Sequence, residues 1–250
     1  MPEHAPATPP RPDDLSRFRT QPVSFMRRSG RLNPRQQRAW DADDGRYLLE
    51  VPRHIARTSV DPAHVLDVAA TYGRSAPLVV EIGSGQGEAV VAAAAAAPER
   101  DFLAVEVYTP GLAQTVLRAA QRDLGNLRLL QANAAEVLAT TLPPASVDEL
   151  WVFFPDPWHK ARHHKRRLVT PEFVGLAARV LAPGGTWRLA TDWAHYADQM
   201  RAVVEADDRF APVARDDGVV ARFDGRVRTS FENKAHDAGR TITDLAYRRR

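Results

Sequence analysis

The sequence predicts an α/β protein with a mostly parallel β-sheet and helices on both faces of the sheet. From Leu78 onward, short apolar runs alternate with longer helical stretches. The short runs are rich in β-branched residues and are bounded by Gly, Pro or polar residues, as strands are. Strands that alternate with helices at this spacing form parallel sheets with right-handed crossovers. A chain of 250 residues can hold one large domain, or at most two small ones.

Each apolar run is predicted to be one strand. In chain order these strands are 78–82, 102–107, 127–131, 147–154, 186–190 and, with an alternating pattern, 241–247. Helices are predicted in four of the intervals: one up to Ala97, one from Thr109 to about Asp123, one from Thr170 to a stop at Pro183-Gly184-Gly185, and one from Trp193 to Glu205. Proline follows both Thr109 and Thr170, and a Thr N-cap before a first-turn proline is a common helix start.

The chain before Leu78 has a different composition. Residues 1–20 are rich in Pro and Arg and poor in large aliphatic residues, which predicts a disordered tail. Residues 21–76 mix basic and aromatic residues with a weak helical pattern. We therefore expect a domain that spans 21–250 and begins with a basic extension over 21–76.

Composition excludes several classes of protein. The absence of Cys excludes disulfides, thiolate metal sites and Cys nucleophiles. No run approaches the ~18 apolar residues that a membrane helix needs. The first residues lack the apolar segment of a secretory signal, so we expect a cytoplasmic protein without a membrane partner.

Basic residues are clustered, although the formal net charge is only +3. The segment 158–167 has no acidic residue and five basic ones: Lys160, Arg162, Lys165, Arg166 and Arg167. Two further clusters are Arg27, Arg28 and Arg31, and Arg248, Arg249 and Arg250. Together, such patches on a nearly neutral protein indicate a polyanionic partner. Taken singly, each run is more typical of ordinary solvated surface.

A glycine-rich turn follows the first predicted strand, with glycines at 83, 85 and 87. These are Gly83, Gly85 and Gly87, and their spacing allows a sharp turn close to a ligand. It differs from the G-x-G-x-x-G spacing that seats a pyrophosphate. Glu106 closes the next strand, where a carboxylate can accept hydrogen bonds from a ribose diol. Glu81 would favour a nearby cation such as a sulfonium. These parts fit S-adenosylmethionine, although a glycine-rich strand end alone is common in α/β proteins.

Two more polar residues follow predicted strands. Asn133 follows the third strand, where its amide could face an adenine edge or simply serve as a turn residue. Asp156 lies between Pro155 and Pro157 at the end of the fourth strand. The prolines restrict the backbone on both sides of Asp156. We therefore expect a rigidly held carboxylate at the edge of the sheet where ligands bind.

Five segments occur together in one order: 24–31, 81–87, 153–167, 190–193 and 229–232. The third contains Phe-Phe-Pro-Asp-Pro-Trp-His-Lys. With these segments the chain resembles the bacterial tRNA (guanine-N7-)-methyltransferases over roughly residues 22–248. The resemblance implies a Rossmann-like, class I S-adenosylmethionine-dependent methyltransferase fold. It also implies methylation of guanine N7 at position 46 in the variable loop of tRNA, which forms 7-methylguanosine.

The resemblance further implies roles for individual residues. The implied cofactor contacts are Glu81, Gly83, Gly85, Gly87, Glu106, Asn133 and Asp156. The implied substrate-binding residues are Lys160, Asp192, Thr229, Ser230, Phe231 and Glu232. Asp156 is also the implied catalytic residue, and no metal is implied. The basic residues expected to contact the RNA backbone are Arg162, Lys165, Arg166 and Arg167. Two positions depart from the family: Asn133 stands where many relatives have Asp, and Ser230 where some have Lys.

This chemistry needs little acid–base catalysis. Guanine N7 has an in-plane lone pair and no proton, so its methylation depends mostly on positioning. The base becomes cationic, and a fixed carboxylate such as Asp156 would stabilise that charge in the transition state. Asp192 and Glu232 could accept hydrogen bonds from guanine N1–H and the exocyclic amine. For Asp192, an N-cap of the following helix is an equally good interpretation.

Other interpretations remain open from the sequence alone. Within the basic segment, His159, His163 and His164 are more typical of phosphate contacts or exposed surface than of metal ligands or bases. Trp158 is predicted to pack under the loop rather than stack on a base. The alternative functions are methylation of another RNA or a small molecule, a non-catalytic RNA-binding protein with this fold, and a dehydrogenase. Monomer and homodimer both remain possible.

Overall fold

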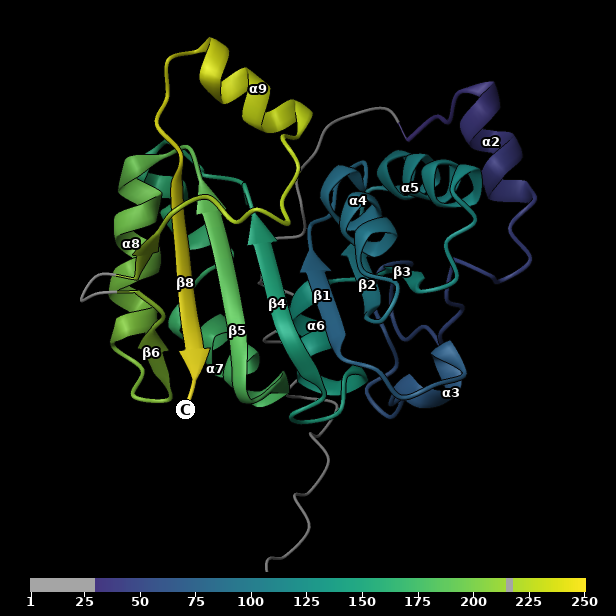
Figure 1. The fold of residues 1–250 in the computed structure, drawn as a ribbon, viewed down its shortest axis with the longest axis horizontal. Coiled ribbons are helices and arrows are strands. Elements are labelled where there is room, and N and C mark those ends of the chain that lie inside the picture. Colours follow the sequence, from purple (N-terminus) through teal and green to yellow (C-terminus); the bar gives the residue numbers. More distant parts are fainter. Residues whose placement is uncertain (1–29, 215–217) are drawn as a thin grey trace, which may run out of the picture.

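The computed structural model describes residues 30–214 and 218–250 as one α/β unit (Figure 1). The expected tail over 1–20 and the arginines at 27 and 28 lie outside the described residues. So does most of the first motif, 24–31. Within the described chain, no helix is both long and apolar enough to cross a membrane.

The described strands form an eight-stranded sheet. They are β1 (Leu78–Ile82), β2 (Asp101–Glu106), β3 (Leu127–Gln131), β4 (Val147–Phe153), β5 (Leu181–Thr191), β6 (Phe210–Pro212), β7 (Val219–Val220) and β8 (Thr243–Arg249). Their order is β3-β2-β1-β4-β5-β8-β6, and β7 pairs with β8. Strands β1 to β5 are parallel to one another, whereas β8 is antiparallel to β5, β6 and β7. The order confirms the predicted mostly parallel, Rossmann-like sheet.

Helices cover both faces of this sheet, as predicted (Figure 1). They are α2 (Pro34–Asp41), α3 (Val68–Tyr72), α4 (Glu88–Ala96), α5 (Thr109–Gln121), α6 (Ala134–Glu136), α7 (Pro171–Val180), α8 (Ala194–Glu205) and α9 (Ser230–Asp237). A π-helical turn, η2 (Val137–Thr141), extends α6, and a 3-10 helix, η3 (Ala161–Arg166), lies in the basic segment. One core layer packs α4 and α5 on the sheet, and the other packs η2, α7 and α8.

The topology determines where a ligand can bind. The chain order reverses between β1 and β4, and in such sheets the crevice beyond the carboxyl ends of the strands is the usual ligand site. In Figure 1 these ends point to the top of the view, and α9 lies just beyond β4 and β5. Helix α9 therefore closes the edge at which the sequence predicts the site.

The prediction was wrong at two helix boundaries. Thr109 is the first residue of α5, whose N-cap is Tyr108, whereas Thr170 is the N-cap of α7 as predicted. The second wrong boundary lies between α7 and β5. The expected stop at Pro183-Gly184-Gly185 lies inside β5, and α7 already ends at Val180. Leu181 pairs with Val147, and the register then shifts before the next pair. The Pro-Gly-Gly segment is therefore an irregularity within the strand, and the Gly184 φ of +81° is one that glycine readily adopts.

Helix α9 was not predicted, although the sequence carries a signal for it. Thr229 is the N-cap, and its hydroxyl accepts a hydrogen bond from the Glu232 N–H at 3.2 Å. Thr followed three residues later by Glu is a helix-start signature. The segment 229–232 therefore starts a helix in addition to the substrate-binding role that the resemblance implies.

Candidate active site

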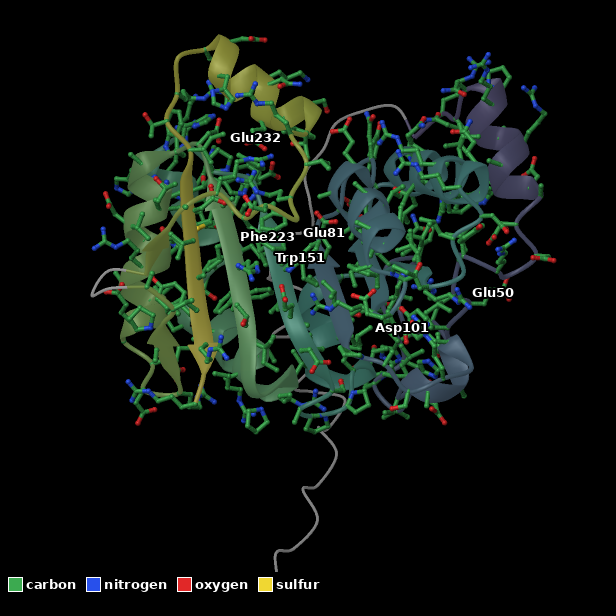
Figure 2. All side chains as sticks on the ribbon, in the orientation of Figure 1. Glu50, Glu81, Asp101, Trp151, Phe223 and Glu232 are labelled. Atoms are coloured by element: carbon green, nitrogen blue, oxygen red, sulfur yellow. The ribbon has the colours of Figure 1, made fainter. Side chains whose placement is uncertain are left out.

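One pocket opens at the carboxyl ends of β1, β2 and β4. It combines residues of the glycine turn, the strand ends, the Pro-Asp-Pro corner and the start of α9. The predicted site residues that line it are Glu81, Gly83, Gly85, Glu106, Asn133, Asp156, Arg166, Thr229, Ser230 and Phe231. Figure 2 marks Glu81 at the carboxyl end of β1 and Glu232 in α9 above it.

The glycine turn is packed too tightly for side chains at two points. Gly87 has a φ of +72°, and a Cβ there would lie 2.4 Å from the side chain of Thr115. Gly111 in α5 approaches so closely that its Cβ would lie 2.2 Å from the carbonyl oxygen of Gly85. Gly87 itself does not line the pocket, so its place is to shape the turn. The sequence did not single out Gly111, because its role depends on a contact with a distant segment.

Glu106 holds the glycine turn in place. One carboxylate oxygen accepts from the Gly85 N–H at 2.9 Å, and the other accepts from the N–H groups of Val107 and Tyr108 at 2.6 and 2.9 Å. Burial raises the pKa of Glu106 above its usual value, although these hydrogen bonds oppose the shift. The oxygen bonded to Gly85 retains a lone pair for a ligand hydroxyl in the pocket.

Glu81 is the most deeply buried carboxyl group of the pocket. The side chain is 4% exposed, and its Oε2 has no hydrogen-bond partner in the described part of the chain. Burial raises the pKa of Glu81 to about 8, and the negative charge of Glu106 adds to the shift. A buried carboxyl with an unused oxygen is suited to receive a cationic or hydrogen-bond-donating group.

The Pro-Asp-Pro corner brings Asp156 into the same pocket as the glycine turn. Phe154 and Trp158, on either side of the corner, both have left-handed backbones, with φ of +52° and +46°. Such conformations in bulky residues are strained, and the surrounding structure must hold them. Asp156 faces the open pocket, and partial desolvation raises the pKa of its carboxyl. The Asp156 side chain makes no hydrogen bond within 30–214 or 218–250, so it is free to act on a ligand.

The start of α9 forms the opposite wall of the pocket. The Ser230 N–H donates to the Glu88 carboxylate at the start of α4, at 2.6 Å. Phe231 is 43% exposed and lies over the glycine turn, where a Cβ on Gly85 would be 3.9 Å from its ring. Because the contact of Ser230 uses its backbone, the Ser in place of Lys leaves this link intact.

Glu232 is placed differently from the prediction. We expected its carboxylate to accept hydrogen bonds from guanine, but it is 1% exposed and does not line the pocket. It pairs with Arg226 at 2.8 Å and with Arg222 at 2.8 Å. Arg226 is fully buried and also pairs with Asp244 of β8 at 2.7 Å. This network fastens α9 to the sheet.

Replacing Arg226 with Met is expected to lower the free energy of unfolding by about 3–5 kcal/mol, because Asp244 loses its ion-pair partner and Glu232 keeps only the partly exposed Arg222. Chemical denaturation at pH 7 measures this loss. The matched control is Arg222→Met, which removes a partner of the same Glu232 from a side chain that is 40% exposed. The control should lose at most about 1 kcal/mol. Equal losses in both variants would contradict the central role of Arg226.

Two further predicted residues, Lys160 and Asp192, are placed outside the pocket. Lys160 is exposed and precedes η3. Asp192 pairs with Arg240 at 2.7 Å, and Trp193, not Asp192, is the N-cap of α8. The N-cap interpretation of Asp192 is therefore wrong. Asn133 does cap α6 through its Oδ1, which accepts from the Ala135 N–H at 2.9 Å, and it also lines the pocket.

The basic segment divides into surface residues and one buried residue. Arg162 and Lys165 do not line the pocket, whereas Arg166 does and lies over the Trp158 ring at 5.0 Å. Trp158 also lines the pocket, so it is not simply packed beneath the loop. Arg167 was expected to contact RNA, but its side chain is 0% exposed. That expectation is wrong, because a fully buried guanidinium cannot reach a phosphate.

The histidines of this segment contact aromatic and imidazole rings. The ring of His159 lies 4.2 Å from the ring of Trp193, and the ring of His164 lies 4.8 Å from that of His195. Desolvation, together with the charges of Arg166 and other nearby basic residues, lowers the pKa of His163. Within the described ranges, no group of three or more His, Asp or Glu residues could hold a metal.

S-adenosylmethionine fits the residues of the pocket. The unused oxygen of Glu81 is suited to a positively charged group, and Glu106 offers an acceptor for a ribose hydroxyl. The glycine turn contributes open backbone, because a Cβ on Gly83 would meet nothing within 4 Å. Asn133 offers its amide N–H groups beside the apolar Val105 and Ala132, a surface suited to an adenine ring.

Known proteins resemble this chain in sequence and in fold. A family described as "Putative methyltransferase" matches residues 75–245. The tRNA (guanine-N(7)-)-methyltransferase of Paenarthrobacter aurescens (strain TC1) is 47% identical and aligns with 98% of this chain and 97% of that protein. The protein of the same name from Nocardioides sp. is 50% identical, over 100% of this chain and 98% of that protein.

Solved structures show the same fold at lower identity. The crystal structure of the 16S rRNA methyltransferase KamB matches with a TM-score of 0.53 and 18% identity, over 79% of this chain and 99% of that one. The antibiotic-resistance methyltransferase Kmr matches with a TM-score of 0.50 and 18% identity, over 80% of this chain and 98% of that one. These likenesses show a class I methyltransferase fold. The near-full-length relatives, at 47% and 50% identity, establish that this chain belongs to the tRNA (guanine-N(7)-)-methyltransferase family.

Proposed function

We propose that the protein transfers a methyl group from S-adenosylmethionine to N7 of guanine 46 in the variable loop of tRNA. The observation that carries this proposal is the shared pocket of Asp156 and the glycine turn, in a chain that belongs to this family. The product is 7-methylguanosine. A tRNA substrate makes the cytoplasm the expected location.

The reaction needs alignment more than acid–base chemistry. Bound in the pocket, S-adenosylmethionine supplies a methyl group on a positively charged sulfur, and the N7 lone pair takes that methyl as the carbon–sulfur bond breaks. No proton has to leave, because N7 carries none. What the chain must do is hold the guanine in line with the methyl group, and such positioning can supply about 7–11 kcal/mol.

Asp156 is the residue best placed to stabilise the product charge. The purine ring gains a positive charge as the methyl arrives, and a carboxylate held at the pocket favours that change. The prolines on either side restrict the backbone, so the carboxylate needs little reorganisation during the reaction. Asp156 is therefore assigned as the catalytic residue.

We assign the guanine side of the pocket to Trp158, Arg166 and Phe231. All three residues line the pocket, and their rings and guanidinium are suited to contact a nucleotide base. A single-stranded or loop base can be turned out of its stack into such a pocket. The exposed Lys160, Arg162 and Lys165 next to it are suited to phosphate contacts. A variable-loop guanine meets both requirements.

The proposal is tested by incubating the protein with radiolabelled S-adenosylmethionine and unmodified tRNA, followed by chemical cleavage at 7-methylguanosine. Label is expected at one guanine in the variable loop, and a transcript with adenine at that position should remain unlabelled. Ribosomal RNA serves as the competing acceptor. Label in ribosomal RNA alone, or at another tRNA atom, would reject the proposal.

A further inference from the structure

The side chain of Arg167 is fully buried beneath the Pro-Asp-Pro corner. Its Nε donates to the carbonyl oxygen of Pro157 at 2.8 Å. Its Nη1 donates to the Oε1 of Gln199 in α8 at 2.7 Å and lies 3.0 Å from the Nδ1 of His195. Because a guanidinium has no acceptor, this His195 nitrogen must be the unprotonated one. The guanidinium also lies over the ring of Tyr196, at 4.8 Å.

The environment of Arg167 differs from that of the other buried arginine. Arg226 is neutralised by Glu232 and Asp244. Arg167, in contrast, forms no ion pair with any carboxylate of the described chain. Its partners are one carbonyl, one amide oxygen and one imidazole. A buried cation without a counterion is expensive to maintain, so stability alone does not account for its presence.

The contact with Pro157 is important because the corner has few hydrogen bonds of its own. Pro155 and Pro157 have no N–H to donate. On the strand side, the Phe154 N–H donates to the Ala190 carbonyl of β5 at 2.8 Å. On the far side, the Pro157 carbonyl is held by Arg167. Asp156 thus lies between two anchored points, and Arg167 provides the second one.

Helix α8 connects this second anchor to the core. Gln199 accepts from Arg167 and donates to the Val169 carbonyl at 3.2 Å. The hydroxyl of Tyr196 accepts from the Val169 N–H at 3.1 Å. The residues that contact the guanidinium are therefore themselves held by hydrogen bonds to the core. This restricts the guanidinium, and through its bond to the Pro157 carbonyl it restricts the corner as well.

We propose that Arg167 is a positioning residue that holds Asp156 in its reactive place by anchoring the Pro157 carbonyl. This inference rests on the proposed function and deepens it. Arg167 acts through Asp156 and touches neither guanine nor phosphate. The guanidinium satisfies the carbonyl, the amide and the imidazole at once, which the ammonium of Lys cannot do with the same planar geometry.

The test compares Arg167→Lys with Arg179→Lys. Arg179 in α7 also forms no ion pair within the described residues; it donates to the backbone carbonyls of Leu138 and Leu142 at 3.0 and 2.7 Å, and it does not line the pocket. Arg167→Lys should lower kcat by about 10- to 100-fold, the scale of a small misplacement at a reacting centre. The KM for tRNA, its salt dependence and the cofactor Kd should stay within twofold. Arg179→Lys should change thermal stability only.

A double-mutant cycle separates positioning from a merely structural role. In an Asp156→Asn background, Arg167→Lys should have little further effect on kcat, because the carboxylate that it positions is gone. If Arg167→Lys does not fold, Gln199→Ala removes another partner of the same guanidinium. This variant should likewise have a lower kcat and an unchanged KM for tRNA. An unchanged kcat, a raised tRNA KM with a flatter salt dependence, or full additivity with Asp156→Asn would overturn the inference.

Backbone NMR gives a readout that does not need tRNA activity. The segment 154–158 has only three amides, those of Phe154, Asp156 and Trp158. Arg167→Lys should shift the amide resonances of Asp156 and Trp158, and Arg179→Lys should not. If the parent protein fails to methylate tRNA, the proposed function fails, while the NMR result still decides whether Arg167 anchors the corner. Unchanged resonances of Asp156 and Trp158 would reject that anchor.

Discussion

Replacing Asp156 with Asn is expected to lower kcat for tRNA methylation by at least about 10²- to 10³-fold while the protein remains folded. The amide keeps the shape of the carboxylate but cannot stabilise the positive charge that develops on the purine. Loss of one preorganised electrostatic partner has effects of this size in other active sites. Asp156→Ala should have at least as large an effect. Single-turnover rates at saturating cofactor measure the chemical step directly.

The pH dependence of kcat provides a separate check on Asp156. Partial desolvation raises the pKa of its carboxyl, so the ionised fraction grows as the pH rises through that pKa. The rate at saturating cofactor should therefore increase with pH on the acidic side, and this limb should be missing in Asp156→Asn. A residual rate above one tenth of the parent's, with the same acidic limb, would remove Asp156 from the chemistry.

The local signals in the sequence were sufficient for the centre of the site. Glu106 ends β2 and Asp156 closely follows the end of β4, and the strand order brings these ends together. The glycine turn required no long-range information either, because it directly follows β1. These residues could be placed because their positions depend on neighbouring residues and on a topology that the alternating pattern predicts.

Arg167 and Glu232 show why the remainder could not be placed. Arg167 stands in a run of basic residues that looks like exposed surface, and its burial depends on Gln199, which is 32 residues away. Glu232 carries the charge expected of a guanine contact, but Arg226 neutralises it from within the fold. The partner of Asp192, Arg240, is 48 residues away. In each case a tertiary contact decides the role of the charge.

Replacing Glu81 with Gln is expected to weaken S-adenosylmethionine binding by about ten- to hundredfold, since hydrogen bonds to charged groups contribute ~1.5–3 kcal/mol. Gln keeps the volume and one acceptor oxygen but has no charge. Isothermal titration calorimetry measures the loss. S-adenosylhomocysteine is the matched ligand, because it lacks the sulfonium charge. If Glu81 faces the sulfur, Glu81→Gln should weaken the binding of S-adenosylmethionine more than the binding of S-adenosylhomocysteine. Equal losses of affinity for the two ligands would place Glu81 beside their amino group.

Protonation makes this binding depend on pH. Burial raises the pKa of Glu81 to about 8, so its carboxyl is mostly neutral at pH 7 before a ligand binds. A bound cation favours the ionised form, and binding at pH 7 should therefore release a proton. Affinity should rise with pH until about 8. Calorimetry in two buffers of different ionisation enthalpy measures the number of protons released when the cofactor binds. In the Glu81→Gln variant no proton should be released from this position.

The same pKa predicts how the stability of the ligand-free protein depends on pH. As the pH rises, the parent protein should lose stability relative to the Glu81→Gln variant. Between the unfolded pKa of about 4.5 and the folded pKa of about 8, the folded state binds more protons at this group than the unfolded state. The contribution of Glu81 to stability therefore falls as the pH rises through this window. Each pKa unit corresponds to about 1.4 kcal/mol, so the Glu81→Gln variant should gain several kcal/mol of stability relative to the parent between pH 5 and pH 8.

Urea denaturation of both proteins without ligand measures this difference. A constant difference across the window would mean that Glu81 is already ionised in the empty pocket, and the proton release predicted for cofactor binding would then be absent as well.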